Sequence, residues 1–238
     1  MLFLRKIKSL GKILRDDFHY IFRYPPLLLK SLDYEEYWQE MQDIGVKERT
    51  LIFSRIIKPG SSVLDIGCGT GTNLKYLMDH NRVDAEGVDI SAIAVKTAQE
   101  RGIKAWVADA TQKEFNLEKQ YDYLIISEVL EHIPKPEELL AKIKQSFRSA
   151  LIVSAPNIGL YRHRLRLLFG RFPIQWAFHP GEHLRFWTLK DFAWWIRQQG
   201  FTIEGSYPSN GFPILYRHFP SLWANMVVYT LKNRDVKY

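Results

Sequence analysis

One stretch decides the fold of this 238-residue chain: Val63-Leu64-Asp65-Ile66-Gly67-Cys68-Gly69-Thr70-Gly71-Thr72-Asn73-Leu74. Its apolar residues Val63, Leu64 and Ile66 are typical of a central parallel strand, and three glycines at alternate positions follow them. Glycine allows a tight turn and lets a ligand approach the backbone without interference from a Cβ atom. The stretch therefore predicts a strand, a ligand-binding turn, and a helix whose first N–H groups point into that turn.

The spacing of the glycines indicates which ligand the turn binds. A dinucleotide site follows the pattern G-x-G-x-x-G, whereas Gly67, Gly69 and Gly71 form G-x-G-x-G. Asp65 lies two residues before the first glycine, where a carboxylate would repel a pyrophosphate but attract the α-amino group of a methionine-like moiety. We therefore expect S-adenosylmethionine (SAM) rather than NAD. The alternative is an ordinary glycine turn before a helix.

Two further acids end the apolar segments that come next. Asp89 closes one segment, where a carboxylate can accept hydrogen bonds from both ribose hydroxyls of a nucleotide. Asp109 closes the next and is placed to accept from the exocyclic amine of adenine. Each acid alone is also consistent with a helix cap or a solvated strand end. Together with Asp65, they indicate a site for an adenosine-containing cofactor.

These features resemble class I SAM-dependent methyltransferases over roughly residues 45–235. The resemblance covers the cofactor half and says little about the methyl acceptor. It implies a doubly wound α/β fold, Rossmann-like, with a mostly parallel seven-stranded sheet whose last strand is antiparallel. It also implies a set of cofactor-binding residues, namely Asp65, Gly67, Cys68, Gly69, Gly71, Asp89, Ile90, Asp109, Ala110 and Ser127.

Apolar segments and helical patterns alternate along the chain, as a doubly wound sheet requires. The expected strands are near 62–66, 84–89, 103–108, 121–127, 149–154, 201–207 and 226–231. The expected helices are near 2–22, 33–57, 71–80, 91–101, 136–147 and 188–199. Thr188 is the expected N-cap of the last helix and Gly200 its stop. Tyr34, Tyr37 and Trp38, in the second helix, either cover the cofactor or pack as ordinary aromatic residues.

A possible catalytic segment, Ser127-Glu128-Val129-Leu130-Glu131-His132, follows the fourth strand, where the family places the transferred methyl group. In a helix, Glu128, Glu131 and His132 would share one face. Two carboxylates and an imidazole there can bind a divalent metal or supply a general base. His132 is our first candidate for the base and His183 the second, with Glu128 beside them. The alternative is that the acids cap a helix or contact substrate.

A later histidine extends this pattern. E-x-x-E-H followed by His183, shortly before Trp187-Thr188, resembles the metal-dependent 2′-O-methyltransferases of small-RNA 3′ ends. Some ubiquinone-type O-methyltransferases carry a similar E-V-L-E-H element, which is also common in the superfamily where no metal is used. The first resemblance implies Mg²⁺ or another divalent metal, which would lower the pKa of an acceptor hydroxyl. Its ligands would be Glu128, Glu131, His132 and His183.

The net charge of +7 is concentrated in two segments. Residues 1–30 contain seven Lys and Arg against two Asp, and residues 157–190 contain six against Glu182. Such an excess outside the cofactor core indicates an anionic partner, either membrane headgroups or a phosphorylated substrate. Nucleic acid is a weaker alternative, because the sequence has no recognisable RNA-binding module.

Residues 1–44 are expected to form a helical extension ahead of a methyltransferase domain over 45–238. Apolar residues recur at helical spacing over 2–22, mostly opposite the basic ones, which predicts a basic amphipathic helix. Such a helix lies on an anionic membrane or packs on protein. The sequence shows no signal peptide and no apolar run long enough to span a bilayer. We therefore expect a cytoplasmic protein, peripheral at the membrane in the first case.

A basic insert at about 157–187 follows the fifth strand. It interleaves arginines with aromatic residues and leucines. Three interpretations are open: a lid that binds phosphate through Arg162, Arg164 or Arg166, an amphipathic piece at a membrane, or a solvated helix face. Its Pro-Asn-Ile-Gly-x-Tyr-Arg sequence resembles W-type methionine-biosynthesis proteins, which lack E-V-L-E-H.

The function expected from the sequence is SAM-dependent O-methylation of a small or lipid-linked molecule, such as a glycan or quinone precursor. The transfer is an in-line displacement at a sulfonium methyl, so positioning and desolvation supply most of the rate. One alternative is metal-dependent methylation of RNA 3′ ends. Another is a non-catalytic, cofactor-binding partner protein.

Overall fold

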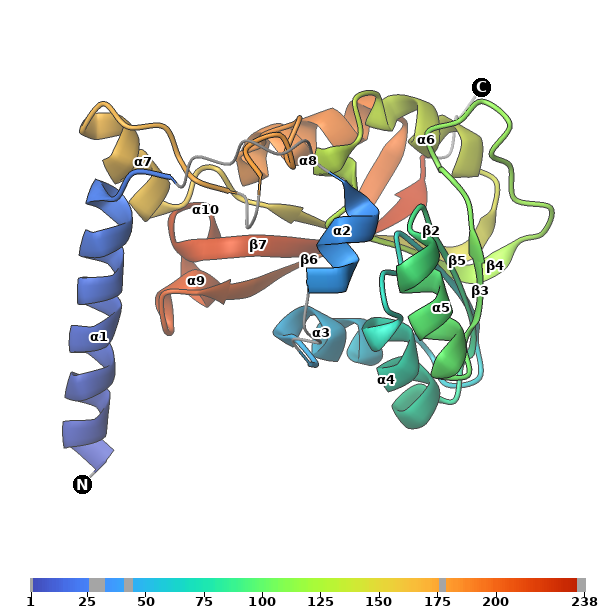
Figure 1. The fold of residues 1–238 in the computed structure, drawn as a ribbon, viewed down its shortest axis with the longest axis horizontal. Helices are drawn as coiled ribbons and strands as arrows, with labels where there is room; N and C mark the ends of the chain where they lie inside the picture. Colours follow the sequence, from blue (N-terminus) through green and yellow to red (C-terminus); the bar gives the residue numbers. More distant parts are fainter. Residues whose placement is uncertain (1, 26–32, 41–44, 176–178, 235–238) are drawn as a thin grey trace.

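A single seven-stranded sheet forms the centre of the molecule (Figure 1). The computed structural model describes residues 2–25, 33–40, 45–175 and 179–234, and for residues 2–10, 14 and 40 it describes the backbone alone. The strand order is β3-β2-β1-β4-β5-β7-β6. The strands are β1 Ser62–Ile66, β2 Asp84–Asp89, β3 Lys104–Val107, β4 Tyr121–Ser127, β5 Phe147–Pro156, β6 Phe201–Gly211 and β7 Ala224–Asn233.

Strand direction agrees with the sequence prediction. Strands β1 to β5 pair in parallel, and β7 runs antiparallel to both of its neighbours, β5 and β6. The register places Asp65 opposite Gly87 and Ile66 opposite Val88, so the ends of β1 and β2 meet at one edge of the sheet. The expected mostly parallel sheet with an antiparallel last strand is therefore confirmed.

Helices cover both faces of the sheet. Alternate strand residues separate into two apolar clusters, because successive side chains of a strand point to opposite faces. One cluster receives α6 (Pro136–Ile143) and α8 (Leu189–Gln198), and the other receives residues of α3 (Glu48–Ile56), α4 (Thr72–Asn81) and α5 (Ala92–Glu100). This is the doubly wound arrangement that the alternation predicted.

The predicted ends of α8 are confirmed. The Thr188 side chain accepts a hydrogen bond from Asp191 N at 3.2 Å, so it caps the first turn. Gly200 follows the helix with φ of +79°, a left-handed conformation that glycine adopts without a Cβ clash.

The predicted helix over 33–57 is wrong as a single helix. The structure has α2 at Tyr34–Glu40 and α3 at Glu48–Ile56, and residues 45–47 between them are not helical. Gly45 has φ of +71°, and Lys47 is extended where α3 begins. A left-handed glycine is not compatible with a helix that continues through it. Residues 41–44 of the predicted helix lie outside the described residues.

Helix α1 (Leu2–Phe22) extends away from the rest of the molecule (Figure 1). The helix itself is as predicted, but the side chains of residues 2–10 and Leu14 lie outside the described residues. Its last turn packs on α7 (Tyr161–Leu168), where Tyr20 and Ile21 are buried with Ile174. None of the described helices combines the length and apolar character needed to cross a bilayer.

The remaining short helices are η1 Leu130–His132, α9 Leu215–His218 and α10 Pro220–Trp223. The predicted insert at 157–187 contains α7, and its residues 176–178 lie outside the described residues.

Candidate cofactor and acceptor site

Two adjoining cavities open where the parallel strands end. The smaller cavity, about 200 Å³, lies over the carboxyl ends of β1 and β2 and the loop after β3. The larger cavity, about 440 Å³, extends from the glycine turn towards β5, β7 and the segment around residue 183. The carboxyl edge of the sheet is where open α/β folds bind ligands. Both cavities are lined by Tyr37, Trp38, Gly67, Glu128, His132 and Glu182.

The glycine turn has the backbone that the sequence predicted. Gly67, Gly69 and Gly71 all have positive φ, at +78°, +53° and +75°. A Cβ atom on Gly67 would lie 2.3 Å from Cγ2 of Val129, so any larger residue there would displace the segment that carries the candidate base. The glycines thus set both the turn and the close approach of two loops.

Asp89 holds the glycine turn in place. Its Oδ2 accepts a hydrogen bond from Gly69 N at 2.8 Å, and its Oδ1 accepts from Ser91 N at 3.0 Å. Burial raises the pKa of Asp89, and the two backbone N–H groups offset part of that rise. Asp89 lines the smaller cavity together with Ile90, as expected of a residue that binds ribose.

Asp109 and Ala110 also line the smaller cavity. The carboxylate of Asp109 already accepts hydrogen bonds within its own turn. Its Oδ1 accepts from the N–H and the hydroxyl of Thr111 at 2.8 and 2.6 Å. Its Oδ2 accepts from Gln112 Nε2 at 2.9 Å. The residue lies where the sequence placed it, and an adenine amine would share oxygens with these donors.

Asp65 is buried beneath the turn. It is 1 % exposed, and neither of its carboxylate oxygens has a hydrogen-bond partner among the described residues. Burial raises the pKa of Asp65 well above its ordinary value, and the Asn73 amide and the Arg49 guanidinium offset only part of this. Asp65, like Gly71, is not among the residues that line the two cavities.

Cys68 and Ser127 form walls of the larger cavity. Cys68 is 6 % exposed, and burial raises the pKa of its thiol, which keeps the sulfur protonated and suits a packing role. Ser127 Oγ lies 3.0 Å from Ser154 Oγ, which joins the ends of β4 and β5.

Helix α2 covers both cavities. The Trp38 ring lies over the glycine turn, within 2.5 Å of where a Cβ atom on Gly69 would be. Glu35 anchors α2 to the start of α5, because its carboxylate accepts from Ser91 Oγ at 2.8 Å and Ala92 N at 2.6 Å. Tyr34 lies above His132, with ring centroids 6.5 Å apart. The aromatic residues of α2 therefore line the cavities.

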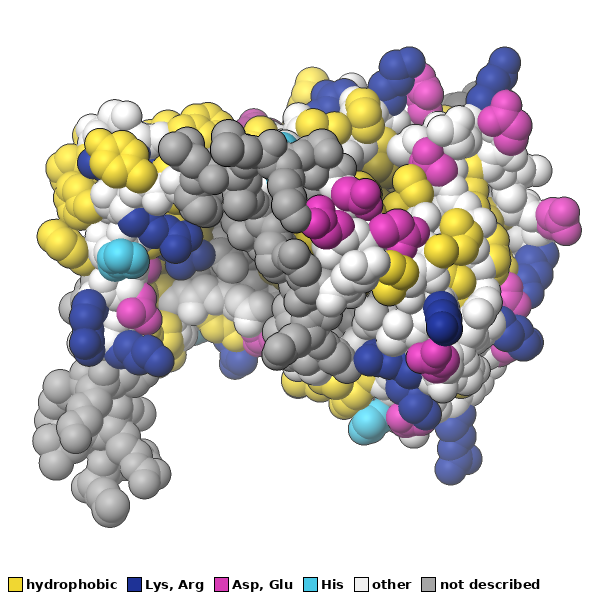
Figure 2. Space-filling view, in the orientation of Figure 1, with side chains coloured by type: hydrophobic (Ala, Val, Ile, Leu, Met, Phe, Trp, Pro, Cys, Tyr) yellow, Lys and Arg dark blue, Asp and Glu magenta, His cyan; other side chains and the backbone are white. Residues whose placement is uncertain are grey.

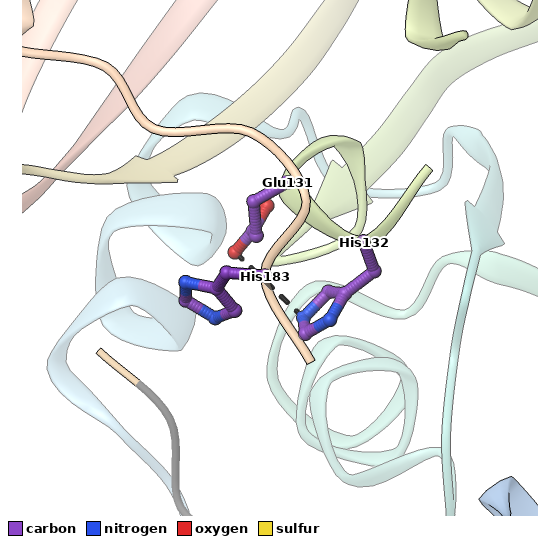
Figure 3. A group of neighbouring side chains, drawn as sticks. All are labelled: Glu131, His132 and His183. Carbon is purple, nitrogen blue, oxygen red and sulfur yellow. Dashed lines mark ion pairs between the residues drawn. The ribbon is translucent and has the colours of Figure 1, made fainter. Parts of the chain in front are cut away.

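Glu131, His132 and His183 converge at the junction of the cavities (Figure 3). One potential ligand atom from each lies within 4.8 Å of those of the others. Glu131 is fully buried, and neither its carboxylate oxygens nor Nδ1 of His183 has a hydrogen-bond partner among the described residues. Burial and the nearby Glu128 raise the pKa of Glu131, whereas burial lowers the pKa of His183 to about 4.

The tautomer of His132 follows from its surroundings. Its Nδ1 lies 2.5 Å from the carbonyl oxygen of Glu182, which can only accept, so Nδ1 carries the proton. Its Nε2 faces Glu131 Oε1 at 4.0 Å, and burial lowers the pKa of the ring. In the neutral ring Nε2 therefore has a free lone pair. Leu184 N and Arg185 N donate to the Glu131 carbonyl at 2.7 and 3.1 Å, which fixes the His183 segment beside it.

The expectation that Glu128 shares a helical face with Glu131 and His132 is wrong. Glu128 has φ of +57°, and only Leu130–His132 form a turn, of the 3₁₀ type. The Glu128 carboxylate instead accepts from Ser154 Oγ at 3.0 Å, and it is not part of the convergent group. It still lines both cavities, so its candidate role is contact with cofactor or acceptor.

The arginines of the insert have three different environments. Arg162 lines the larger cavity. Arg164 is exposed and donates to the Gly159 carbonyl at 2.6 Å. Arg166 is 2 % exposed and donates to the carbonyls of Tyr20, Ile21, Arg23 and Phe172, so it cannot reach a phosphate. Of the three predicted phosphate ligands, Arg162 alone lies at the cavity.

Sequence reasoning missed two residues of the site. Arg49 lines the larger cavity, and its charge acts on both Asp65 and Glu131. Glu35 holds α2 in place through α5. Neither belongs to a recognisable motif, and the only available signal was that charged residues lie on helices ahead of the first strand.

Comparison with known proteins agrees with this geometry. Residues 37–205 match the methyltransferase domain family. A bifunctional methionine biosynthesis protein MetXA/MetW from Rhodopirellula baltica is 29% identical over 196 residues, covering 72% of this chain and 30% of that protein. Phosphoethanolamine N-methyltransferase 2 from Caenorhabditis elegans is 29% identical over 113 residues, covering 44% of this chain and 26% of that protein. The chain thus spans less than a third of the length of these relatives.

Solved structures show the same fold. Magnesium protoporphyrin IX methyltransferase from Synechocystis, with bound S-adenosylhomocysteine, aligns with a TM-score of 0.55 at 16% identity, covering 93% of this chain and 95% of that one. The chain belongs to the methyltransferase domain family, and it has the fold of class I SAM-dependent methyltransferases. SAM is the cofactor that this family uses.

Proposed function

We propose that this methyltransferase transfers the SAM methyl group to a hydroxyl oxygen of a small or lipid-linked molecule. The observation that carries the proposal is the buried Glu131 side chain, which has no hydrogen-bond partner within the part of the chain that the structure describes and lies beside the unprotonated Nε2 of His132. A hydroxyl acceptor must lose a proton as it is methylated, unlike a thioether, which becomes a stable sulfonium. A proton acceptor at the junction of the two cavities suits that requirement.

The smaller cavity is the proposed site for the adenosine part of SAM. Asp89 would accept from the ribose hydroxyls and Asp109 from adenine, with Ile90 and Ala110 against the base. The methionine part would enter the larger cavity, where Arg49 offers a partner for its carboxylate. The Asp65 carboxylate, buried beneath the turn, would attract the ammonium through its charge or through water. This placement directs the sulfonium methyl towards Glu128 and His132, which line both cavities.

The chemistry of the transfer sets the roles of these residues. The sulfonium is already a good leaving group, so the protein contributes alignment and exclusion of water. Trp38 and Tyr34, on α2, cover the cofactor. His132 takes the hydroxyl proton on Nε2, and the imidazolium that forms would lower the raised pKa of Glu131, 4.0 Å away, and favour its carboxylate form. His183 is the alternative base.

A divalent metal is a second candidate feature of the same site. Glu131, His132 and His183 fit a cation such as Mg²⁺ or Mn²⁺, since a buried carboxylate and a buried ring nitrogen there have no partner among the described residues. The Glu182 carbonyl orients His132 as a second layer of contacts commonly orients a metal-binding histidine. A bound cation would lower the pKa of an acceptor hydroxyl.

The cofactor assignment is tested by calorimetric titration of the full chain with SAM. We expect Asp89→Asn to weaken binding about 10- to 100-fold, because charge-assisted hydrogen bonds contribute about 1.5–3 kcal/mol each. Asp84→Asn is the matched control, since Asp84 lies at the opposite end of the same strand and is exposed. Equal affinities of the two variants would contradict the placement of SAM.

Catalysis and metal use are tested with Glu131→Gln. We expect this variant to bind SAM normally but to lose transfer of radiolabelled methyl groups into alkali-stable ether products of a cell extract. Manganese titration in the presence of SAM then separates the two roles of Glu131, because a metal ligand binds Mn²⁺ only in the unmodified protein. Wild-type protein that binds SAM and transfers no methyl group would favour the non-catalytic alternative.

A further inference from the structure

An exposed apolar surface covers the end of α7 and the last turns of α1. Figure 2 shows hydrophobic side chains gathered in this part of the molecule, with Lys and Arg around them. We call this surface the apolar corner. The exposed fractions of its side chains run from 37% at Phe22 to 76% at Leu168. The corner consists of Phe18, Phe22, Leu167, Leu168, Phe169 and Phe172.

The apolar corner is continuous rather than scattered. The ring centroids of Phe18 and Phe22 lie 4.8 Å apart, and those of Phe22 and Phe169 lie 5.1 Å apart. These contacts join two segments that are distant in the sequence into one surface. Single exposed apolar residues are normal, but a contiguous group of this size usually marks an interaction site.

The charges around the apolar corner are mainly positive. Lys12, Arg15, Arg23 and Arg164 are exposed there. Among the described residues of 11–25 and 157–175, Asp16 is the only exposed acid, because Asp17 is buried and accepts a hydrogen bond from the Tyr161 hydroxyl. A protruding apolar surface edged by cations is complementary to an anionic bilayer, whose acyl region takes the apolar groups and whose headgroups pair with the cations.

The apolar corner also leads to the larger cavity. The Phe172 ring lies 5.8 Å from that of Phe186, which lies 6.3 Å from that of His183. On the other side, the Tyr20 hydroxyl lies 2.5 Å from Nδ1 of His163, and His163 lines the cavity. The same helices that carry the exposed apolar groups therefore form part of the cavity wall.

We propose that the apolar corner docks on the surface of an anionic lipid bilayer. In this position the row Phe172, Phe186 and His183 connects the acyl region with the larger cavity, so the acceptor is an amphiphilic molecule drawn from the bilayer. The identification of the acceptor class rests on the proposed methyl transfer, whereas the docking of the corner does not.

Vesicle co-sedimentation of the full chain tests the docking. We expect binding to vesicles of equal parts phosphatidylcholine and phosphatidylglycerol, and weaker binding to phosphatidylcholine alone. The double variant Leu168→Glu and Phe169→Glu should bind at least about tenfold more weakly, because it places two anions in the contact. Val107→Glu is the matched control, since this residue is 51% exposed on the edge strand β3, far from α1 in Figure 1.

A spin label tests the orientation on the membrane. A nitroxide on Phe172→Cys should become shielded from a water-soluble nickel chelate when vesicles are added, while one on Glu114→Cys should not. Both positions are exposed, and the native Cys68 is buried, so labelling is selective. Charge is tested with the double variant Lys12→Glu and Arg15→Glu, which should lose the preference for anionic vesicles.

Several outcomes would overturn the docking proposal. They are a wild type that does not sediment with anionic vesicles, a Leu168→Glu and Phe169→Glu variant that still does, and a Phe172 label that stays accessible. A concentration-dependent dimer that this double variant abolishes would assign the corner to a second copy of the chain instead. SAM titration of the same samples keeps the tests separate, because the variants should bind SAM as the wild type does.

Discussion

Two buried carboxylates, Asp65 and Glu131, have no hydrogen-bond partner among the described residues. A buried polar group without a partner destabilises a folded protein by about 1–3 kcal/mol, so each such group is a candidate for a functional role. Both are within the electrostatic influence of Arg49. We interpret them as a site prepared for the charged end of the cofactor and for the acceptor proton.

The pKa of Asp65 makes a testable prediction about cofactor binding. Burial raises this pKa in the free protein, and the SAM ammonium should lower it again. The complex then binds fewer protons than the free protein, so SAM affinity should rise with pH up to the raised pKa of Asp65. The free energy of unfolding of the free protein should instead fall as pH rises above about 3.9. Over that range Asp65 keeps its proton in the folded state and has lost it in the unfolded state.

Calorimetry checks this prediction through proton release. SAM titrations in two buffers of different ionisation enthalpy should give different apparent enthalpies for the wild type. The difference should disappear in Asp65→Asn, which cannot ionise. Asp122→Asn should behave as the wild type, because Asp122 lies near the start of β4, at the end of that strand opposite to the cavities. Proton uptake on binding by the wild type would contradict the assignment.

Among single residues, the sequence predicted those that belong to a local motif. It missed those whose place in the site depends on tertiary packing. Asp65, Asp89 and the glycine turn are local to strand ends, so spacing identified them. Arg49 reaches the site from a helix before the first strand, and no spacing rule connects it to Asp65. The left-handed Glu128 was also missed, because its conformation depends on contacts with β5 rather than on its neighbours in sequence.

Helix α2 is the element whose mobility should control cofactor exchange. It carries Tyr34 and Trp38 over the cavities, and Glu35 ties it to α5 through three hydrogen-bond donors. The Ser91 hydroxyl and the Ala92 N–H lower the pKa of Glu35, so the contact is made by the carboxylate. A helix of seven residues has little stability of its own and depends on this attachment.

We therefore expect Glu35→Gln to loosen α2. SAM should bind several-fold more weakly and dissociate faster in stopped-flow measurements, while the melting temperature of the chain changes little. Glu138→Gln is the control, because Glu138 pairs with Lys135 on the surface of α6, away from the cavities. Unchanged dissociation in Glu35→Gln would show that α2 does not retain the cofactor.

Helices and strands were predicted well where the apolar residues keep a single spacing along the whole element. Strands β1, β2 and β4 and helix α8 have clear patterns and the expected ends, whereas β5, β6 and β7 are longer than expected. The false continuation from α2 into α3 arose because Gly45, whose left-handed backbone does not fit a helix, was not recognised as a break. The first half of the insert, by contrast, has no regular alternation of apolar and polar residues. Helix α7 buries His163 and Arg166, whereas Leu167 and Leu168 are exposed.

On the scale of the whole molecule, α1 is attached to the fold chiefly through α7. The Arg166 guanidinium donates to the carbonyls of Ile21 at 3.1 Å and Arg23 at 3.0 Å, so it caps the end of α1. We expect Arg166→Met to release α1, with trypsin cleaving after Lys12 or Arg15 at least about tenfold faster, because local opening governs such cleavage.

The control for this prediction is Arg164→Met, because Arg164 is exposed and its Nε hydrogen bond is local to α7. Cleavage sites are identified by mass spectrometry of the products, and the thermal unfolding of the remaining chain should be nearly unchanged in both variants. Equal protection of α1 in the two variants would mean that Arg166 does not hold it.

The aromatic row from Phe172 through Phe186 to His183 has a kinetic consequence. An acceptor that follows this row meets the enzyme by two-dimensional diffusion within one leaflet, and its mole fraction in the lipid replaces its bulk concentration in the rate law. Adding inert lipid would then dilute the substrate without changing its total amount. The cofactor, which is dissolved in water, would stay insensitive to that dilution, so the two substrates would follow different concentration scales.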